Sequence, residues 1–412
     1  MDGMKAGAGK SEIRFPAEMF PIEGFNGIHD NPCARILVLE SGVRAAFVSM
    51  ELVMVDDEML DVLKGLICDI TGTAKENIWI LATHTITTPH PPRREPEKKP
   101  AYEKAIVEAV TTAAVQAAVM KDAVLEIGEG TCDINRNRDR LTPYGWWIGP
   151  GADGPSSKRL MVLSVKDAGG AMIGALVNYD LKPSAIDNAG MADGSRKISG
   201  DVTGAACALA EEEWGAPCLY MTGAAADQVP AEQAWYEELD EEGRNRQVDL
   251  GVEKGLELAG KYGRMLGEAI MDTAAAGRRM PAGRIIRRED SFRWDLHDRI
   301  ERKPQTEITY VPLGKSVELP VDVIVLGDIA MVAEKPEVCH ATEQELLARS
   351  PFPVTMLFTM VNGGMKYMPD QESCRRVTWE TIGTMLMPGA AEKFVDVAAG
   401  LLASASQTQA GN

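Results

Sequence analysis

The sequence predicts a single α/β domain with a mixed β-sheet core and flanking helices. Three observations lead to this prediction. Short apolar runs alternate along the chain with stretches of helical pattern, which is typical of α/β proteins. Several runs are continuously apolar, as are strands that a sheet buries on both faces. No internal repeat or flexible linker divides the 412 residues, so we expect one domain over 1–402, compatible with two lobes, and a frayed tail over 403–412.

The strands are placed by apolar runs and by the turn residues between them. Gly169-Gly170 and Gly327-Asp328 stand between neighbouring apolar runs and predict tight turns. Runs this short fit strands better than helices. The predicted strands are 36–40, 45–50, 78–82, 160–165, 171–178, 218–221, 285–295, 308–311, 323–326, 329–333 and 354–361.

Helices are predicted where apolar residues return every three or four positions. In 57–71 these residues fall on one side of the helix. Either Ser199 or Asp201 is expected to cap a helix over 201–214. The charged, proline-rich segment 91–100 fits neither a strand nor a helix, so we expect a loop there. The remaining predicted helices are the Ala-rich 101–120, the largely helical 238–276, 340–349 and 390–402.

Composition excludes several classes of protein. The apolar fraction of 45% and the charged fraction of 25% are ordinary for a globular chain. A net charge of −18 argues against nucleic acid and anionic membranes as partners, and no apolar run is long enough to span a membrane. Seven scattered cysteines without C-x-x-C spacing, and a first segment without an apolar signal sequence, favour the cytoplasm. We expect a small-molecule substrate and leave open a homo-oligomer.

One apparent motif near the N-terminus is a poor match to a nucleotide-binding loop. Gly7-Ala8-Gly9-Lys10-Ser11 ends as a phosphate-binding loop does. That loop also needs a glycine where Met4 stands, and a strand in front of it. We therefore do not expect nucleotide binding.

Polar residues that directly follow predicted strands are the candidate functional residues. Thr83-His84-Thr85 follows the strand at 78–82, and the chain has only five histidines. In open α/β sheets ligands bind beyond the carboxyl ends of the strands, so we expect these residues to line one cleft. Together they suit metal binding or acid–base chemistry. They are His84, Lys182, Asp227, Glu337 and Tyr367.

Each of these residues also has an ordinary structural interpretation. A histidine after a strand is most often a hydrogen-bonded core or capping residue, and Asp227 in its Gly/Ala-rich turn can be a cap. Lys182 can be merely solvated, and Tyr367 can be a core residue with its hydroxyl at the surface.

Taken in order, eight motifs resemble the neutral/alkaline (non-lysosomal) ceramidase family, specifically its N-terminal catalytic domain and short bacterial relatives. The resemblance spans nearly the whole chain and implies a ceramidase-like α/β fold. The motifs are GIHDNPCAR (27–35), ATHT (82–85), DINR (133–136), ISGDVTG (198–204), GAAADQVP (223–230), KPE (335–337), NGGMKYMP (362–369) and PGAAE (388–392).

The resemblance implies a zinc-dependent hydrolase of amide bonds. In that family two histidines, a glutamate and a tyrosine hold the zinc ion, which activates water. Carried over by motif, the ligands are His84, Glu337 and Tyr367. Asp227 would act as a base or orient one, and Arg136 would hold a carboxylate or an oxyanion.

The chain departs from the family pattern at three positions. Lys182 stands where the second zinc histidine is expected, and a protonated lysine has no lone pair for a metal. Ile86 replaces the second histidine of H-T-H, and Val229 replaces the family serine. His90 or His340 is a candidate replacement ligand. Without that serine, a signal peptide or the immunoglobulin-like C-terminal domain, we do not expect ceramide as substrate.

Three functional hypotheses follow. The first is a cytosolic hydrolase of a small amide or other C–N bond, assisted by a metal on His84, Glu337 and Tyr367. The second is a metal-free enzyme of the same fold in which Lys182 acts as cation or base, or returns as a carbamylated metal ligand. The third is a non-catalytic binding protein that keeps the fold. Metal content and activity on amides distinguish them.

Overall fold

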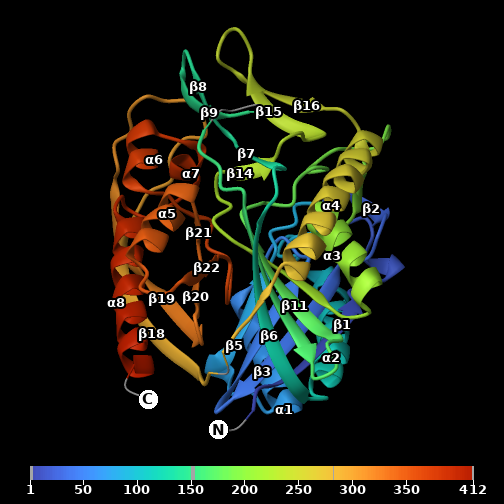
Figure 1. Ribbon diagram of the computed structural model, residues 1–412. Coiled ribbons are helices and arrows are strands. Elements are labelled where there is room, and N and C mark those ends of the chain that lie inside the picture. Colours follow the sequence, from blue (N-terminus) through green and yellow to red (C-terminus); the bar gives the residue numbers. More distant parts are fainter. Residues whose placement is uncertain (1–2, 150–153, 282, 411–412) are drawn as a thin grey trace.

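Two β-sheets pack against each other in the structure, a computed structural model that describes residues 3–149, 154–281 and 283–410 (Figure 1). The larger, nine-stranded sheet has the order β13 (Cys218–Thr222), β11 (Met172–Tyr179), β10 (Arg159–Asp167), β6 (Lys121–Thr131), β1 (Lys5–Glu12), β3 (Cys33–Ser41), β4 (Val43–Met50) and β5 (Ile78–Ala82), with β17 (Arg278–Arg279) paired to β6. The four-stranded sheet has the order β18 (Ile285–His297), β19 (Pro312–Leu326), β20 (Ile329–Glu334) and β22 (Val354–Phe358).

Both faces of the larger sheet are buried, which explains its continuously apolar strands. In β3, Ile36 and Val38 face one core, whereas Leu37 and Leu39 face a second core shared with the small sheet. Trp79 of the large sheet meets Phe358 of the small sheet edge to face, with ring centroids 6.2 Å apart. Side chains from the two sheets therefore interlock.

Helices cover the outer face of each sheet, so the molecule has four layers. Figure 1 shows α5 (His340–Arg349) and α8 (Ala390–Ala410) beside the small sheet, and α3 (Asp201–Trp214) and α4 (Val252–Ala275) at the opposite side of the molecule. The cores beneath these helices are continuous with the strands that they cover. No helix in the described ranges has the length and apolar character needed to cross a membrane. The main helices are α1 (Asp57–Thr71), α2 (Lys99–Ala117), α3 (Asp201–Trp214), α4 (Val252–Ala275), α5 (His340–Arg349) and α8 (Ala390–Ala410).

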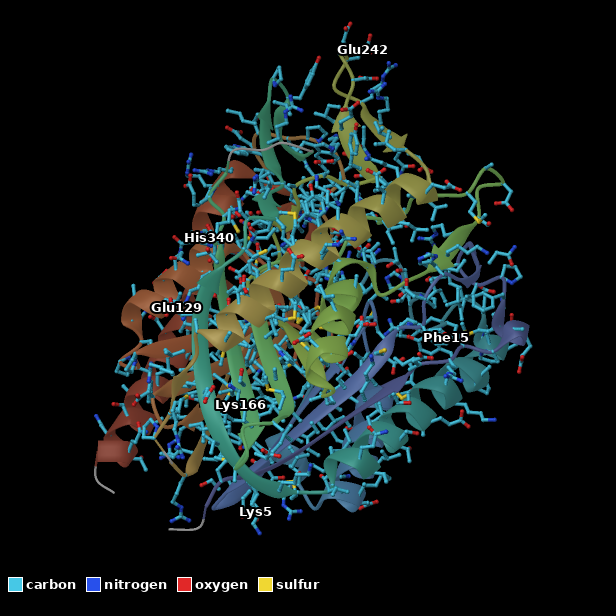
Figure 2. The ribbon with its side chains drawn as sticks, turned by 45° about the vertical axis from the view of Figure 1, so that its right-hand side comes forward. Lys5, Phe15, Glu129, Lys166, Glu242 and His340 are labelled. Atoms are coloured by element: carbon cyan, nitrogen blue, oxygen red, sulfur yellow. The ribbon has the colours of Figure 1, made fainter. Side chains whose placement is uncertain are left out.

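Several of the short elements lie at one end of the molecule, where the hairpin tip at Glu242 lies, and Lys5 marks the opposite end (Figures 1 and 2). Several pair only with each other. The short elements are η1 (Ala17–Met19), β2 (Phe25–Ile28), η2 (Lys75–Asn77), η3 (Pro96–Lys98), β7 (Asn135–Asn137), β8 (Asp139–Thr142), β9 (Gly145–Ile148), β12 (Arg196–Ile198), β14 (Gln228–Pro230), β15 (Trp235–Leu239), β16 (Asn245–Asp249), β21 (Glu337–Val338), β23 (Tyr367–Met368), α6 (Gln371–Arg376) and α7 (Trp379–Gly383).

The glycine-rich segment near the N-terminus is strand β1. Its glycines allow helix α2 to pack closely against the strand. A Cβ atom on Gly7 would lie 2.1 Å from the carbonyl oxygen of Ala117, and one on Gly9 would lie 2.0 Å from that of Ala113. Both acceptors belong to α2. Only glycine allows the helix backbone to approach the strand so closely.

Two predicted segments have a different structure. In 91–100 the chain forms η3 and then enters α2 at Lys99, because proline is tolerated in the first turn of a helix. In 238–276 the acidic start forms the β15–β16 hairpin, and α4 begins only at Val252. The hairpin turn is held by Asp240, whose carboxylate accepts the backbone N–H groups of Glu242 and Arg244.

Three further predictions of extent or capping were wrong. Helix α8 does not end at 402 but continues to Ala410, where the side chain of Gln409 donates to the carbonyl of Gly327; the last two residues of the predicted tail, 411–412, lie outside the described residues. The strand predicted at 308–311 begins instead at Pro312. The N-cap of α3 is Gly200, because the Asp201 carboxylate instead accepts N–H groups from the preceding loop.

Candidate functional site

Four of the five predicted strand-end residues converge between the two sheets. His84 follows β5, Lys182 follows β11, and Glu337 and Tyr367 begin β21 and β23. The last two strands pair in parallel with Glu337 opposite Tyr367. We call these four residues the Lys182 cluster.

Backbone pairing fixes the position of His84. The N–H of Thr83 donates to the carbonyl oxygen of Met50 at 2.9 Å, and the N–H of Thr85 donates to the carbonyl oxygen of Leu52 at 3.1 Å. Between these anchors His84 adopts φ 59°, in the left-handed region that non-glycine residues rarely occupy. Such strained residues concentrate at functional sites.

Short contacts join the side chains of the Lys182 cluster. His84 Nδ1 lies 2.7 Å from Glu337 Oε1. Lys182 Nζ lies 3.2 Å from Glu337 Oε2 and donates to the hydroxyl of Tyr367 at 3.3 Å. The Glu337 side chain is 0% exposed and that of Lys182 3%, whereas His84 keeps 16% of its side-chain surface. One carboxylate is therefore held between an imidazole and an ammonium, out of water.

Neighbouring charges set the protonation states of Glu337 and His84. Burial by itself would raise the pKa of Glu337, but His84, Lys182 and Arg138 lower it to about 2. Burial lowers the pKa of His84 and outweighs the opposite effect of Glu337. At neutral pH the site therefore holds a carboxylate and a neutral imidazole.

Tyr367 is surrounded by positive charge. Its pKa is lowered, because Arg138 and Lys182 outweigh the burial that would raise it. The Arg138 guanidinium lies 5.3 Å from the centroid of the Tyr367 ring, and Lys182 Nζ lies 4.9 Å from it. Its phenol therefore gives up a proton more readily than an ordinary tyrosine does.

The arginine at the site is Arg138, not Arg136. Arg136 is 38% exposed at its side chain and pairs with Asp133 at 2.6 Å. Arg138 is buried and donates twice to Glu380, at 2.9 and 2.5 Å. The sequence contains two consecutive Asn-Arg pairs, at 135–136 and 137–138. The family motif was matched to the first pair and therefore pointed to Arg136 instead of Arg138.

Asp227 lies beside the Lys182 cluster, but its carboxylate is hydrogen-bonded to residues outside the cluster. Its carboxylate accepts from the Asn137 side chain at 2.8 Å and from the backbone N–H of His340 at 3.0 Å. Burial and the nearby Glu380 raise its pKa to about 7. It lines a cavity of about 820 Å³, separate from the cavity beside Lys182.

A cavity of about 90 Å³ opens beside Lys182, Arg138 and Tyr367. Ile86 and Val229, at two positions where the resemblance predicts polar residues, both line it. Binding pockets for drug-sized ligands measure roughly 300–1,000 Å³. This cavity therefore fits only a small chemical group. Its other lining residues are Ile148, Gly149, Ser184, Asp187, Gln233, Trp235, Tyr236 and Glu237.

The arrangement does not fit the zinc ion that the resemblance implies. Lys182 Nζ already lies within 3.3 Å of both Glu337 and Tyr367, two of the three expected ligands. An ammonium offers no lone pair and repels a divalent cation. Neither candidate replacement completes the set. His90 pairs with Glu23 at the surface, and His340 belongs to a separate group.

Sequence reasoning missed several residues of the site. Arg138 and Asp187 lie just outside short strands or in loops, and Glu380 lies in the short helix α7. Burial, mainly, and Asp201 raise the pKa of Asp187 to about 7, while Lys182 lowers it. Loop residues carry no periodic pattern, so only the Asn-Arg repeat could have indicated one of them.

Comparison with known proteins identifies the fold. No protein-family model and no curated protein matches the chain. The solved structures that match include a "Ceramidase complexed with C2" and a neutral ceramidase from Pseudomonas aeruginosa, each with a TM-score of 0.75 and 16% identity over 98% of this chain. The match covers 76% and 75% of those chains, respectively. The chain therefore has a ceramidase-like α/β fold, which confirms the predicted fold class.

Proposed function

We propose that this protein is a hydrolase that cleaves an amide or related C–N bond in a small molecule, with Lys182 supplying the positive charge of its active site. The observation that carries the proposal is the buried contact of Lys182 with Glu337 and Tyr367, 3.2 and 3.3 Å long. This cluster lies beyond the ends of strands in a ceramidase-like fold, where α/β proteins place their active sites.

His84 is the base in this proposal. The negative charge of Glu337, 2.7 Å from Nδ1, favours the tautomer with the proton on that nitrogen, which leaves the lone pair on Nε2. The lowered pKa of His84 keeps the ring neutral. The imidazole then takes a proton from water as the water oxygen attacks the carbonyl carbon.

Lys182, Arg138 and Tyr367 act on the charges that the attack creates. The two cations lie next to the small cavity and stabilise the oxyanion that forms there. Tyr367, with its lowered pKa, donates its proton to the leaving nitrogen as the C–N bond breaks. The phenolate formed is stabilised by the same cations and regains a proton from His84.

The size of the cavity supports a small, polar substrate and not ceramide. A volume of about 90 Å³ holds no acyl chain. Apolar Ile86 and Val229 stand beside polar Ser184, Asp187 and Gln233, so one end of the substrate is apolar and the other polar.

All seven cysteines are free, which supports a reducing compartment such as the cytoplasm.

Hydrolysis of a panel of small amides tests the proposal. We expect turnover by the wild type that survives chelation, and a loss of about 10²-fold or more in kcat for His84→Gln. His90→Gln, which changes an exposed histidine, is the matched control and should retain activity. Turnover that depends on added metal would contradict the role of Lys182. Absence of turnover on every amide, despite substrate binding, would favour a binding protein.

A further inference from the structure

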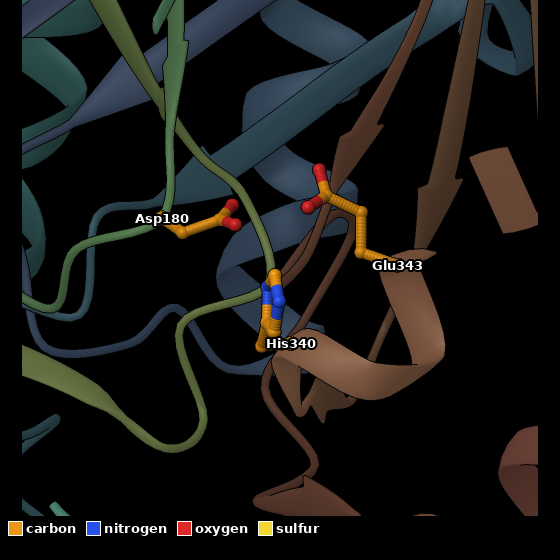
Figure 3. A group of neighbouring side chains, drawn as sticks. All are labelled: Asp180, His340 and Glu343. Carbon is orange, nitrogen blue, oxygen red and sulfur yellow. The ribbon is translucent and has the colours of Figure 1, made fainter. Parts of the chain in front are cut away.

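A second polar group, separate from the Lys182 cluster, consists of Asp180, His340 and Glu343. Each offers one ligand atom, and these atoms all lie within 4.8 Å of one another. Figure 3 shows the two carboxylates reaching from opposite sides toward one space, with the His340 ring beside it. We propose that this group binds a divalent metal ion of the zinc or manganese type.

The sequence brings the three ligands together by simple geometry. Asp180 directly follows β11, at the end of the larger sheet. His340 begins α5, and Glu343 lies three residues later in the same helix. Residues at this spacing project from the same face of a helix. The site would therefore link the larger sheet to the helix that covers the small one.

The polar atoms of the group lack other partners, which points to a ligand. Asp180 Oδ2 and His340 Nδ1 are fully buried and form no hydrogen bond within the described residues. Asp180 is 2% exposed, and its other oxygen accepts the N–H of Ala224 at 2.8 Å. Glu343 is 3% exposed; its side chain has a long contact of 3.5 Å from Gln344 and otherwise meets the carboxyl group of Asp180, another member of the group. Buried polar groups left unpaired in this way are costly.

The ligand set selects the chemistry of the ion. One imidazole and two carboxylates suit zinc or manganese, whereas magnesium and calcium prefer ligand sets made of oxygen alone. Three protein ligands leave at least one position for water. His340 is partly exposed, so the ion has a route of entry.

The site would join two segments that lie close to the Lys182 cluster. Asp180 lies two residues before Lys182, and the backbone N–H of His340 donates to Asp227. A bound ion would stabilise both segments without being needed for turnover, which in our proposal depends on the Lys182 cluster. The inference does not depend on the proposed function, because metal binding is measured without turnover.

Elemental analysis and calorimetric titration with zinc and with manganese test the proposal on the full chain. We expect about one ion per chain in the wild type, and a melting temperature that rises with the metal. His340→Gln and Glu343→Gln should each lower the affinity at least ~10-fold. Glu345→Gln, an exposed change on the same helix, should leave the affinity unchanged.

Two comparisons keep the test decisive. His84→Gln should retain the ion, and its loss there instead of in His340→Gln would place the metal in the Lys182 cluster and overturn the proposal. Without metal, Glu343→Gln should be at least as stable as the wild type, because the change removes one carboxylate of a buried pair. A loss of metal binding in this variant can therefore be distinguished from misfolding. Binding that survives both His340→Gln and Glu343→Gln, or no binding by the folded wild type, would also overturn it.

Discussion

At the scale of single residues, the site is organised by one carboxylate. Glu337 contacts both His84 and Lys182, so it orients the base and neutralises the ammonium at the same time. A buried ion pair of this kind is sensitive to the removal of one partner, because the remaining charge stays in a medium of low polarity. Stability and activity are therefore coupled at this residue.

Glu337→Gln should lower the free energy of unfolding at pH 7 by about 3–5 kcal/mol, measured by urea denaturation. The folded-state pKa of about 2 lies below the ordinary 4.5, so Glu337 contributes roughly 3 kcal/mol above pH 4.5 that is lost as the pH falls toward 2. Because a glutamine side chain does not titrate, the free energy of unfolding of Glu337→Gln should not show this decrease between pH 4.5 and 2. Glu257→Gln removes an exposed pair with Lys254 and should change stability by less than about 1 kcal/mol. Equal effects of both changes would contradict this account.

The pH dependence of turnover reports on His84. Its pKa is lowered from 6.5 by burial, and only the neutral ring can act as a base. The kcat/KM value should therefore stay high through neutral pH and decline on the acid side with a midpoint below 6.5. An acid limb centred above 6.5 in a pH–rate profile would mean that another group is the base.

At the scale of elements, helices were predicted from sequence more accurately than the segments between them. The limits of α1, α3 and α5 match the predicted ones to the residue, because a helical repeat and its ends are local features. Strand β1 was missed, because its glycines give it no apolar pattern. The β15–β16 hairpin was missed, because its residues are polar and the turn at Asp240–Arg244 is held by side chains.

The contact between β1 and α2 gives a prediction at this scale. Gly7→Ala should destabilise the fold by about 1–3 kcal/mol, because the added Cβ would meet a carbonyl oxygen of α2 at 2.1 Å. Gly260→Ala is the matched control. It lies in α4 with no atom within 4 Å of the new Cβ, and should stabilise the helix by about 0.5–1 kcal/mol. Thermal unfolding of both variants measures the difference, and a Gly7→Ala protein as stable as the wild type would contradict the packing.

At the scale of the whole molecule, the order of the strands determines where the site lies. The pairs β4–β5, β11–β13 and β20–β22 are parallel, and their carboxyl ends bring the Lys182 cluster together. The rule that ligands bind at such ends could be applied from sequence alone; it selected His84, Lys182, Glu337 and Tyr367, and also Asp227, which lies beside the cluster. Arg138 and Glu380 could not be selected in this way, because their positions depend on how separate loops pack.

The turnover number of Lys182→Ala tests the central claim most directly. The claim is that an ammonium in a ceramidase-like fold provides the charge needed to cleave a C–N bond. The measurement compares kcat for wild type, Lys182→Ala and the exposed control Arg136→Ala on one amide substrate, after chelation. The account predicts a loss of about 10²-fold or more for Lys182→Ala and little change for Arg136→Ala. Equal kcat values for Lys182→Ala and the wild type, with the fold preserved, would contradict it.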